Sequence, residues 1–294
     1  MSMLRSNGLF LEYDTFGGPS DPAVILIAGL GFQLIDWPVP FCEQLAASGY
    51  FVIRFDNRDI GLSQKLEEEP VPDLVALGDE IRAGAALDLP YNLTDMMEDV
   101  VGVLDALSID AVHLIGMSMG GMIAQLTAIH YPKRLRSLIS IMSSSGSSAL
   151  PPPNAAATTI LMSAPASEDL SDVVTFGLNV NDVIGSPGFR WNREELTEHI
   201  RSCVERCYYP PGYVRQYAAV LGSPSRADSL PNITAPTLVI HGTEDLLVLS
   251  EAGKETARLI PNARLELVEG MGHDLSPALC DHLAGLILPH IKAN

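Results

Sequence analysis

Residues 111–128 read AVHLIGMSMGGMIAQLTA, and this stretch decides the fold. Its start, 111–115, is an apolar run typical of a buried parallel strand. Its end, 121–128, is rich in helix-forming residues. The pattern Gly-x-Ser-x-Gly lies between the two, with Ser118 at its centre. A strand, a tight turn and a helix in this order predict a nucleophile elbow.

The turn explains which residues flank Ser118. A turn this tight forces Ser118 to a positive φ, so small residues must lie on both sides of it. Gly116 and Gly120 let neighbouring backbone approach because they carry no Cβ. We therefore expect the Ser118 hydroxyl to stand exposed at a helix N-terminus as a catalytic serine. The Met119 amide and the helix dipole would favour an oxyanion there.

Composition limits the remaining classes of function. The chain has 294 residues, of which 47% are hydrophobic and 18% charged, so it is not disordered and can bury one large core or two modest ones. Its 18 Lys and Arg against 36 Asp and Glu give a formal net charge of −18. A field of this sign repels phosphate backbones and anionic lipids, so we expect no nucleic-acid or membrane partner.

The sequence shows no signal for export or for membrane insertion. Residues 1–8 show neither the apolar core nor the cleavage site of a signal peptide. Apolar runs such as 24–28 and 135–142 have the length of strands and are far too short to span a membrane. The four cysteines are too few and too scattered for a disulfide framework. We expect a cytoplasmic protein, and the oligomeric state stays open.

Strand-like and helix-like segments alternate along most of the chain, which predicts an α/β fold with a mainly parallel sheet and helices on both faces. The alternation breaks after 135–142, where a serine- and proline-rich run begins, and resumes near residue 236. We expect a core of residues 1–142 and 226–294 and an inserted helical cap of residues 143–225. A smaller insertion, 66–90, is expected beside the cap. Strands are expected at 9–16, 23–28, 50–55 and 135–142, and helices at 38–47, 93–107, 193–207 and 211–221.

A serine hydroxyl becomes a good nucleophile when a base takes its proton and an acid orients that base. For a serine on such an elbow, the acid and then the histidine follow on loops after later strands. The strand at 237–241 runs into a loop that carries Asp245. The strand at 265–268 is followed by the sequence GMGH, whose glycines let His273 fold over the elbow. We predict Asp245 as the acid and His273 as the base.

Other titratable residues lie close to these two in the sequence. Glu244 adjoins the predicted acid and is expected to face elsewhere. His241 ends a strand and His113 lies within one, so we expect both to be core histidines whose hydrogen bonds are satisfied. Asp274 directly follows the predicted base, and sequence neighbours rarely face each other well enough to pair.

The second oxyanion donor is expected in the loop that follows the strand at 23–28. This loop reads Gly-Leu-Gly, which brings flexible backbone near the elbow. We favour the Leu30 amide, with Gly31 as the next choice. Each such donor contributes about 3 kcal/mol in the transition state.

One predicted helix carries three residues of the types that bind metals. His199, Cys203 and Cys207 share a helix face at i, i+4 and i+8. A structural zinc site needs four ligands, and no fourth is evident. We expect neither a metal nor a cofactor.

Several of these segments together resemble the α/β-hydrolase superfamily over nearly the whole chain, and within it the aclacinomycin methylesterase group most. The segments are the Gly-Leu-Gly loop at 29–31, DNRDIGLS at 56–63, the elbow, the Asp245 loop and GMGH at 270–273. The resemblance implies an α/β-hydrolase fold with a helical cap that shapes the acyl or alcohol pocket. It also implies Ser118 as nucleophile, Asp245 as acid, His273 as base, and the Leu30 and Met119 amides as the oxyanion hole.

Serine at position 118 also bears on the type of reaction. Epoxide hydrolases and haloalkane dehalogenases would have aspartate there, whereas Ser118 suits acyl transfer. We expect a cofactor-independent serine hydrolase that cleaves a neutral, fairly apolar carboxylic ester through an acyl-enzyme. A lactonase, a perhydrolase or a C–C bond hydrolase would use the same triad, so these stay open. A hydrolase-fold ligand sensor with weak turnover is the alternative outside catalysis.

Overall fold

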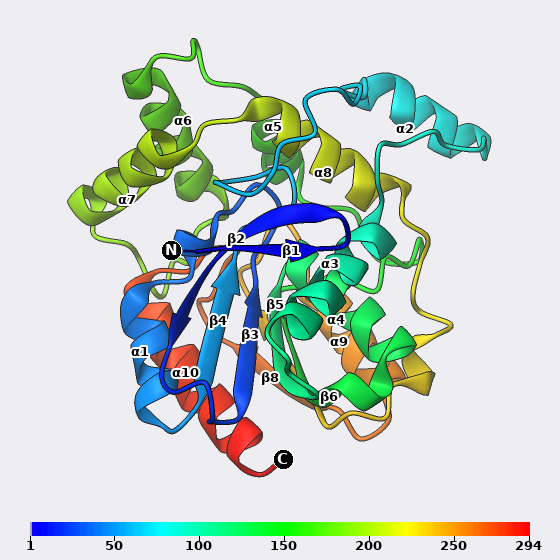
Figure 1. The fold of residues 1–294 in the computed structure, drawn as a ribbon. Helices are drawn as coiled ribbons and strands as arrows, with labels where there is room; N and C mark the ends of the chain where they lie inside the picture. The colour runs from blue at the N-terminus through cyan, green and yellow to red at the C-terminus, as the bar shows by residue number, and fades with distance from the viewer. Residues whose placement is uncertain (1) are drawn as a thin grey trace.

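The structure is a computed structural model and describes residues 2–294. One eight-stranded sheet has the order β1-β2-β4-β3-β5-β6-β7-β8. The pairs β1·β2 and β2·β4 are antiparallel and all later pairs are parallel, which confirms the mainly parallel sheet (Figure 1). The strands are β1 (Ser2–Ser6), β2 (Leu9–Phe16), β3 (Ala23–Ile27), β4 (Phe51–Phe55), β5 (Val112–Met117), β6 (Leu135–Ile141), β7 (Thr237–Gly242) and β8 (Arg264–Val268).

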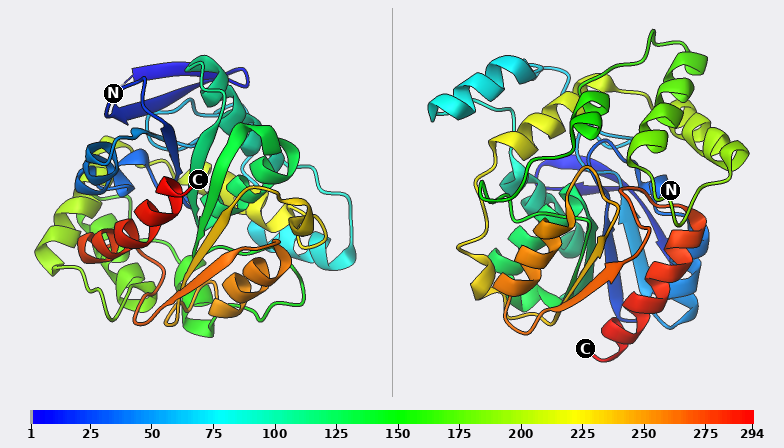
Figure 2. Two further views of the ribbon diagram at one scale, coloured as in Figure 1. Left: turned by 90° about the horizontal axis from the view of Figure 1, so that it is seen from below. Right: turned by 180° about the vertical axis from the view of Figure 1, so that it is seen from behind.

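Helices cover both faces of this sheet, as predicted (Figure 2). One face packs against α3, α4 and the end of α9, and the other against α1 and α10. None of the helices in residues 2–294 is long and apolar enough to cross a membrane. The helices are α1 (Val39–Ala47), α2 (Leu74–Ala83), α3 (Leu93–Ala106), α4 (Met119–His130), α5 (Ala155–Leu161), α6 (Leu170–Ile184), α7 (Arg193–Arg206), α8 (Pro210–Gly222), α9 (Ser250–Leu259) and α10 (Pro277–Lys292), with short 3-10 turns η1 (Leu34–Asp36), η2 (Pro132–Arg134) and η3 (Leu230–Asn232).

The central strands show why the sequence folds this way. Every residue of β3 and of β5 is buried, because a parallel strand between two helix layers is covered on both faces. Along β3, Ile25 and Ile27 enter one core cluster, whereas Val24 and Leu26 enter the other. Because the pairs from β4·β3 to β7·β8 are all parallel, these strands end at one edge of the sheet, and the loops that leave this edge lie together.

The four helices α5 to α8 lie between β6 and β7 in the chain and above that edge of the sheet in space (Figure 1). We call residues 143–225 the insert. The smaller insertion, 66–90, contains α2, which packs against α8. The pattern at 193–207 and 211–221 predicted α7 and α8, whereas α2, α5 and α6 were not expected as separate helices.

Candidate active site

The elbow has the geometry that its glycines predict. Ser118 has φ 52° and ψ −120°, between the end of β5 and the start of α4. A Cβ on Gly116 would lie 2.2 Å from the Gly120 carbonyl oxygen, and one on Gly120 would lie 2.2 Å from the Ile27 oxygen. The Ser118 N–H donates to the Ile141 carbonyl at 2.9 Å, which ties the turn to β6. Only glycine fits at the two flanking positions, so the strained serine conformation is imposed by its surroundings.

The structure brings the three predicted triad residues together from loops after β5, β7 and β8. The His273 Nε2 lies 2.9 Å from the Ser118 Oγ, and the His273 Nδ1 lies 2.7 Å from the Asp245 Oδ2. Both Asp245 and His273 are buried. With Nδ1–H donating to the carboxylate, Nε2 is left to accept the serine proton.

The surroundings of Asp245 keep it ionised. Its Oδ1 accepts from the N–H groups of Leu247 at 2.9 Å and Val248 at 2.8 Å. Burial alone would raise the pKa of Asp245, but the charge of His273 and hydrogen bonds from His241 and His273 outweigh it. The pKa of Asp245 therefore lies well below its usual value, and the carboxylate is available to orient the imidazole.

His241 is buried as expected, but one of its two ring nitrogens has no hydrogen bond within residues 2–294. Its Nε2 donates to the Val248 carbonyl at 2.7 Å and lies 3.5 Å from the Asp245 Oδ2. Its Nδ1 has no hydrogen-bond partner within residues 2–294, because Gly253 of α9 packs against that side of the ring. The expectation was wrong for this atom. His113 does satisfy it, with Nδ1 2.8 Å from the Ser137 Oγ.

The other nearby carboxylates lie away from the imidazole. Glu244 is exposed. Asp274 accepts from the Ser186 N–H at 3.1 Å and from the Asn181 Nδ2 at 2.8 Å. Neither Glu244 nor Asp274 forms a hydrogen bond with the His273 ring in the described chain. Asp245 is therefore the carboxylate that faces His273.

The insert holds the histidine loop. The His273 N–H donates to the Ile184 carbonyl at the end of α6, with a distance of 2.7 Å. The Gly272 N–H donates to the Ser186 Oγ at 2.9 Å. Gly270 has φ 75°, and a Cβ there would lie 2.8 Å from the Gly188 Cα. Backbone therefore meets backbone where the insert touches this loop. No local sequence pattern predicts this contact.

Two backbone amides near the serine are free to bind an oxyanion. Neither the Leu30 N–H nor the Met119 N–H donates a hydrogen bond within residues 2–294. The Gly31 N–H, the second choice from the sequence, donates instead to the Gln216 Oε1 at 3.0 Å. A Cβ on Gly29 would lie 3.4 Å from the Cβ of the serine, so this loop borders the elbow. The arrangement leaves one free donor on the loop and one at the start of α4.

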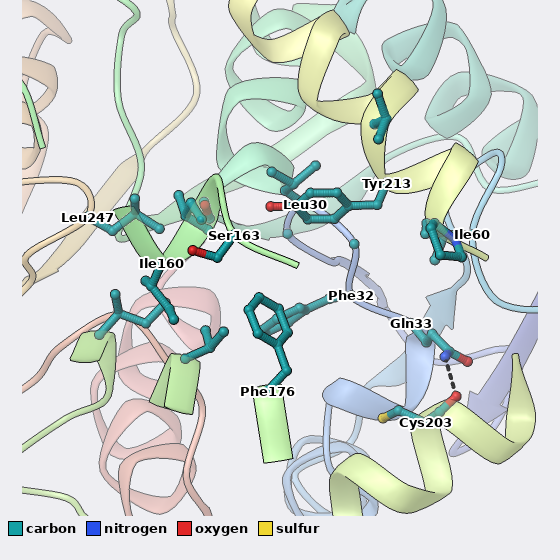
Figure 3. Close-up of a pocket in the computed structure, with 18 of the residues that line it drawn as sticks. Leu30, Phe32, Gln33, Ile60, Ile160, Ser163, Phe176, Cys203, Tyr213 and Leu247 are labelled. Atoms are coloured by element: carbon teal, nitrogen blue, oxygen red, sulfur yellow. Dashed lines mark hydrogen bonds between the residues drawn. The ribbon is translucent and has the colours of Figure 1, made fainter. Parts of the chain in front are cut away.

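A cavity of about 510 Å³ contains Ser118 and His273 in its wall. Figure 3 shows Phe176 of α6 and Tyr213 of α8 in this wall together with Leu30 of the core. Leu74 of α2 is the one contribution from segment 66–90 within the described chain. Most of the wall is aliphatic or aromatic and comes from the insert, including Ile160, Met162, Phe176, Tyr208, Tyr213 and Val214.

His199 and Cys203, two of the three candidate metal ligands, lie close to Asp36, and Cys207 is not part of this cluster. The His199 Nε2 lies 2.9 Å from the Asp36 Oδ1 and 3.7 Å from the Cys203 Sγ. Gln33 Nε2 donates to the Cys207 carbonyl, so this cysteine takes part through its backbone. Burial raises the pKa of the Cys203 thiol, so this side chain is a neutral thiol beside the pair. The geometry is that of a His–Asp pair that joins α7 to η1.

Comparison with known proteins places the chain in one family. The family described as the alpha/beta hydrolase fold matches residues 22–277. Rhodomycin D methylesterase of Streptomyces sp. strain C5 is 27% identical, and the alignment covers 99% of this chain and 98% of that esterase. 2-Hydroxymuconate semialdehyde hydrolase of Pseudomonas sp. strain CF600 is 28% identical over 85% of this chain and 86% of its own. The enol-lactonase of Burkholderia xenovorans LB400 superposes with a TM-score of 0.75 at 20% identity, covering 99% of this chain and 100% of the lactonase.

These findings confirm the predicted resemblance. The family match spans most of the chain, and the methylesterase relative agrees with the similarity to a methylesterase group that the motifs indicated. The three relatives carry names of different activities, so the family fixes the fold and leaves the substrate open. The chain belongs to the α/β-hydrolase fold family.

Proposed function

We propose that the protein hydrolyses a neutral, largely apolar carboxylic ester through an acyl-enzyme formed on Ser118. The observation that carries this proposal is the charge of the cavity wall. No lysine or arginine in residues 2–294 lines the cavity. A substrate carboxylate placed against this wall would lose its water without gaining a cationic partner. The net charge of −18 also disfavours anionic substrates.

The geometry supports the following sequence of steps. Ser118 Oγ attacks the ester carbonyl carbon while His273 Nε2 takes its proton, and Asp245 stabilises the imidazolium. The amides of Leu30 and Met119 donate to the oxygen that becomes negative. Collapse of this intermediate breaks the bond to the alcohol, which leaves with the proton from His273. Water, deprotonated by His273, then releases the acid and restores the serine.

The family alone does not choose which bond is cleaved. Relatives with this fold are named for a methyl ester, an enol-lactone and a semialdehyde. A serine nucleophile with an oxyanion hole can attack any of these carbonyl groups. The apolar wall, which carries no lysine or arginine in residues 2–294, favours a neutral substrate, and we take a simple ester as the first candidate.

Two esters of equal chain length test the proposal. p-Nitrophenyl pentanoate ends in a methyl group, and mono-p-nitrophenyl glutarate ends in a carboxylate. We expect kcat/KM to be at least about 100-fold higher for the pentanoate, because the carboxylate would be buried unpaired. Ser118→Ala should abolish both activities. Equal or faster turnover of the glutarate would contradict the proposal, and faster turnover of δ-valerolactone than of the pentanoate would redirect it to lactones.

A further inference from the structure

Helix α8 reaches from the insert to the loop that carries the Leu30 amide. Gln216, on this helix, is fully buried. Its Oε1 accepts from the Gly31 N–H at 3.0 Å, and its Nε2 donates to the Arg58 carbonyl at 2.9 Å. Both ends of one side chain are thus used to join two core loops, those after β3 and after β4. The family motifs predicted neither contact.

The Gly31 hydrogen bond falls at the centre of a tight turn. The Phe32 N–H donates to the Gly29 carbonyl at 3.2 Å, which closes a turn over Leu30 and Gly31. Gly31 has φ 73°, as the third residue of a type II turn requires. The Gly29 carbonyl and the Leu30 N–H belong to one peptide plane. The turn therefore sets the direction of the Leu30 N–H, and Gln216 holds the middle of the turn.

Neighbouring residues fix α8 firmly enough to serve as a reference. Arg215 forms two hydrogen bonds with Asp59 at 2.5 and 3.0 Å, and both side chains are at most 1% exposed. A Cβ on Gly31 would lie 2.7 Å from the Tyr213 ring, so the helix also packs directly on the turn (Figure 3). The Arg215–Asp59 pair, which does not involve the oxyanion loop, thus helps to fix the position of Gln216.

We propose that Gln216 is a positioning residue for the oxyanion hole, an inference that rests on the proposed function. Stabilisation of an oxyanion requires donors within about 2.7–3.1 Å of the place where the charge develops. Without the Gln216 acceptor, the partly buried Gly31 N–H loses its partner and the backbone of the turn is no longer held in one position. The Leu30 N–H then loses its alignment, which weakens transition-state binding and leaves substrate binding intact.

The direct test replaces both hydrogen-bonding ends of the side chain with Gln216→Met. We expect kcat for p-nitrophenyl pentanoate to fall about 10- to 100-fold with KM changed less than about threefold. Labelling of Ser118 by a fluorophosphonate, whose transition state uses the same donors, should slow by a similar factor. Gln125→Met is the matched control, because Gln125 is also fully buried but its Oε1 accepts from Arg226 and not from this loop.

Gln216→Glu provides a second variant with its own signature. A protonated carboxyl accepts from the Gly31 N–H and donates to the Arg58 carbonyl, as the amide does. An ionised carboxylate has no proton for the Arg58 oxygen. We expect this variant to keep most of its activity at pH 6 and to lose about tenfold or more relative to wild type at pH 9. A merely destabilised protein would not show this pH dependence.

The outcomes separate this inference from the proposed function. If folded Gln216→Met keeps kcat and labelling rate within threefold of wild type, or changes KM alone, the inference is wrong whether or not an ester is the substrate. If wild type labels at Ser118 but hydrolyses no neutral ester, the proposed function fails. The labelling rates of the Gln216 variants then still decide the inference.

Discussion

The core and the insert contribute to the cavity in different ways. The core supplies Ser118, Asp245, His273 and the two free amides, all on loops at one edge of the sheet. The insert supplies most of the apolar wall. It also holds two of the core loops, through Ile184 and Gln216. The groups proposed to react therefore belong to the core, whereas the insert contacts the loops that carry them.

The triad substitutions test the core side of this comparison and should have the largest effects. Ser118→Ala should lower kcat about a million-fold, His273→Ala nearly as much and Asp245→Asn about 10⁴-fold, because the acid orients the base and does not react. Glu244→Gln is the matched control and should be mild, since Glu244 is exposed. Steady-state kinetics on folded proteins measures the order. A larger loss from Glu244→Gln than from Asp245→Asn would show that the acid is misassigned.

A substitution in the wall tests the insert side. Phe176→Ala opens space in the cavity, so kcat/KM should shift about 10-fold toward longer acyl chains. The rate at which a small fluorophosphonate labels Ser118 should stay within about threefold. Leu74→Ala removes the one wall contribution of segment 66–90 in the described chain and should shift the chain-length profile much less. If Leu74→Ala moves the profile and Phe176→Ala does not, segment 66–90 forms the selective wall.

The core and the insert should also respond to pH with opposite signs. In the core, burial and the charges of Arg136 and His290 lower the pKa of His113 from 6.5 to about 4. Because the unfolded chain binds this proton more readily, stability is lost as pH falls below 6.5. The loss should be about 2 kcal/mol between pH 7.5 and 5. Urea unfolding should show a smaller loss for His113→Gln than for wild type, and an equal loss would contradict the assignment.

His199 joins the insert to the core and behaves in the opposite way. Burial lowers its pKa, but the hydrogen bond and charge of Asp36 outweigh this and raise it. The pair therefore contributes fully below pH 6.5, and its contribution is lost as pH rises through the folded pKa. His199→Gln should cost about 1 kcal/mol at pH 6 and less at pH 9. A cost that grows toward pH 9 would show that the ion pair is not the source.

Local sequence patterns were sufficient to predict the position of a site residue where a short motif directly follows a strand. The elbow, the Asp245 loop and the His273 loop each follow a strand directly, and parallel strands end at a common edge. The predicted fold class was confirmed because the alternation of strand-like and helix-like segments is also a local pattern. The structural roles of His241 and Gln216 were not predictable, because each depends on a partner that the sequence pattern does not identify.

The missed elements have physical reasons as well. β1 has alternating exposed and buried residues and is short and polar, so it reads as a strand only beside β2. α2 buries only Leu77 and has Gly78 in its interior, which lowers its helix propensity. Gln216 and Gly31 are 185 positions apart, and Asp36 and His199 are 163 apart. Contacts at such separations follow from the packing of the insert on the core and have no local signature.

The most direct test of the account is to trap the intermediate on Ser118. Asp245→Asn holds His273 in the wrong tautomer and should slow both steps, but the attack of water more than acylation, because p-nitrophenolate leaves without a proton from His273. The variant is mixed with p-nitrophenyl pentanoate, quenched in acid at times from seconds to hours, and measured by intact-protein and peptide mass spectrometry. We expect one pentanoyl group per chain on the peptide that contains Ser118, and none in Ser118→Ala. A pentanoyl group on another residue, or p-nitrophenol release from Ser118→Ala at the wild-type rate, would contradict it.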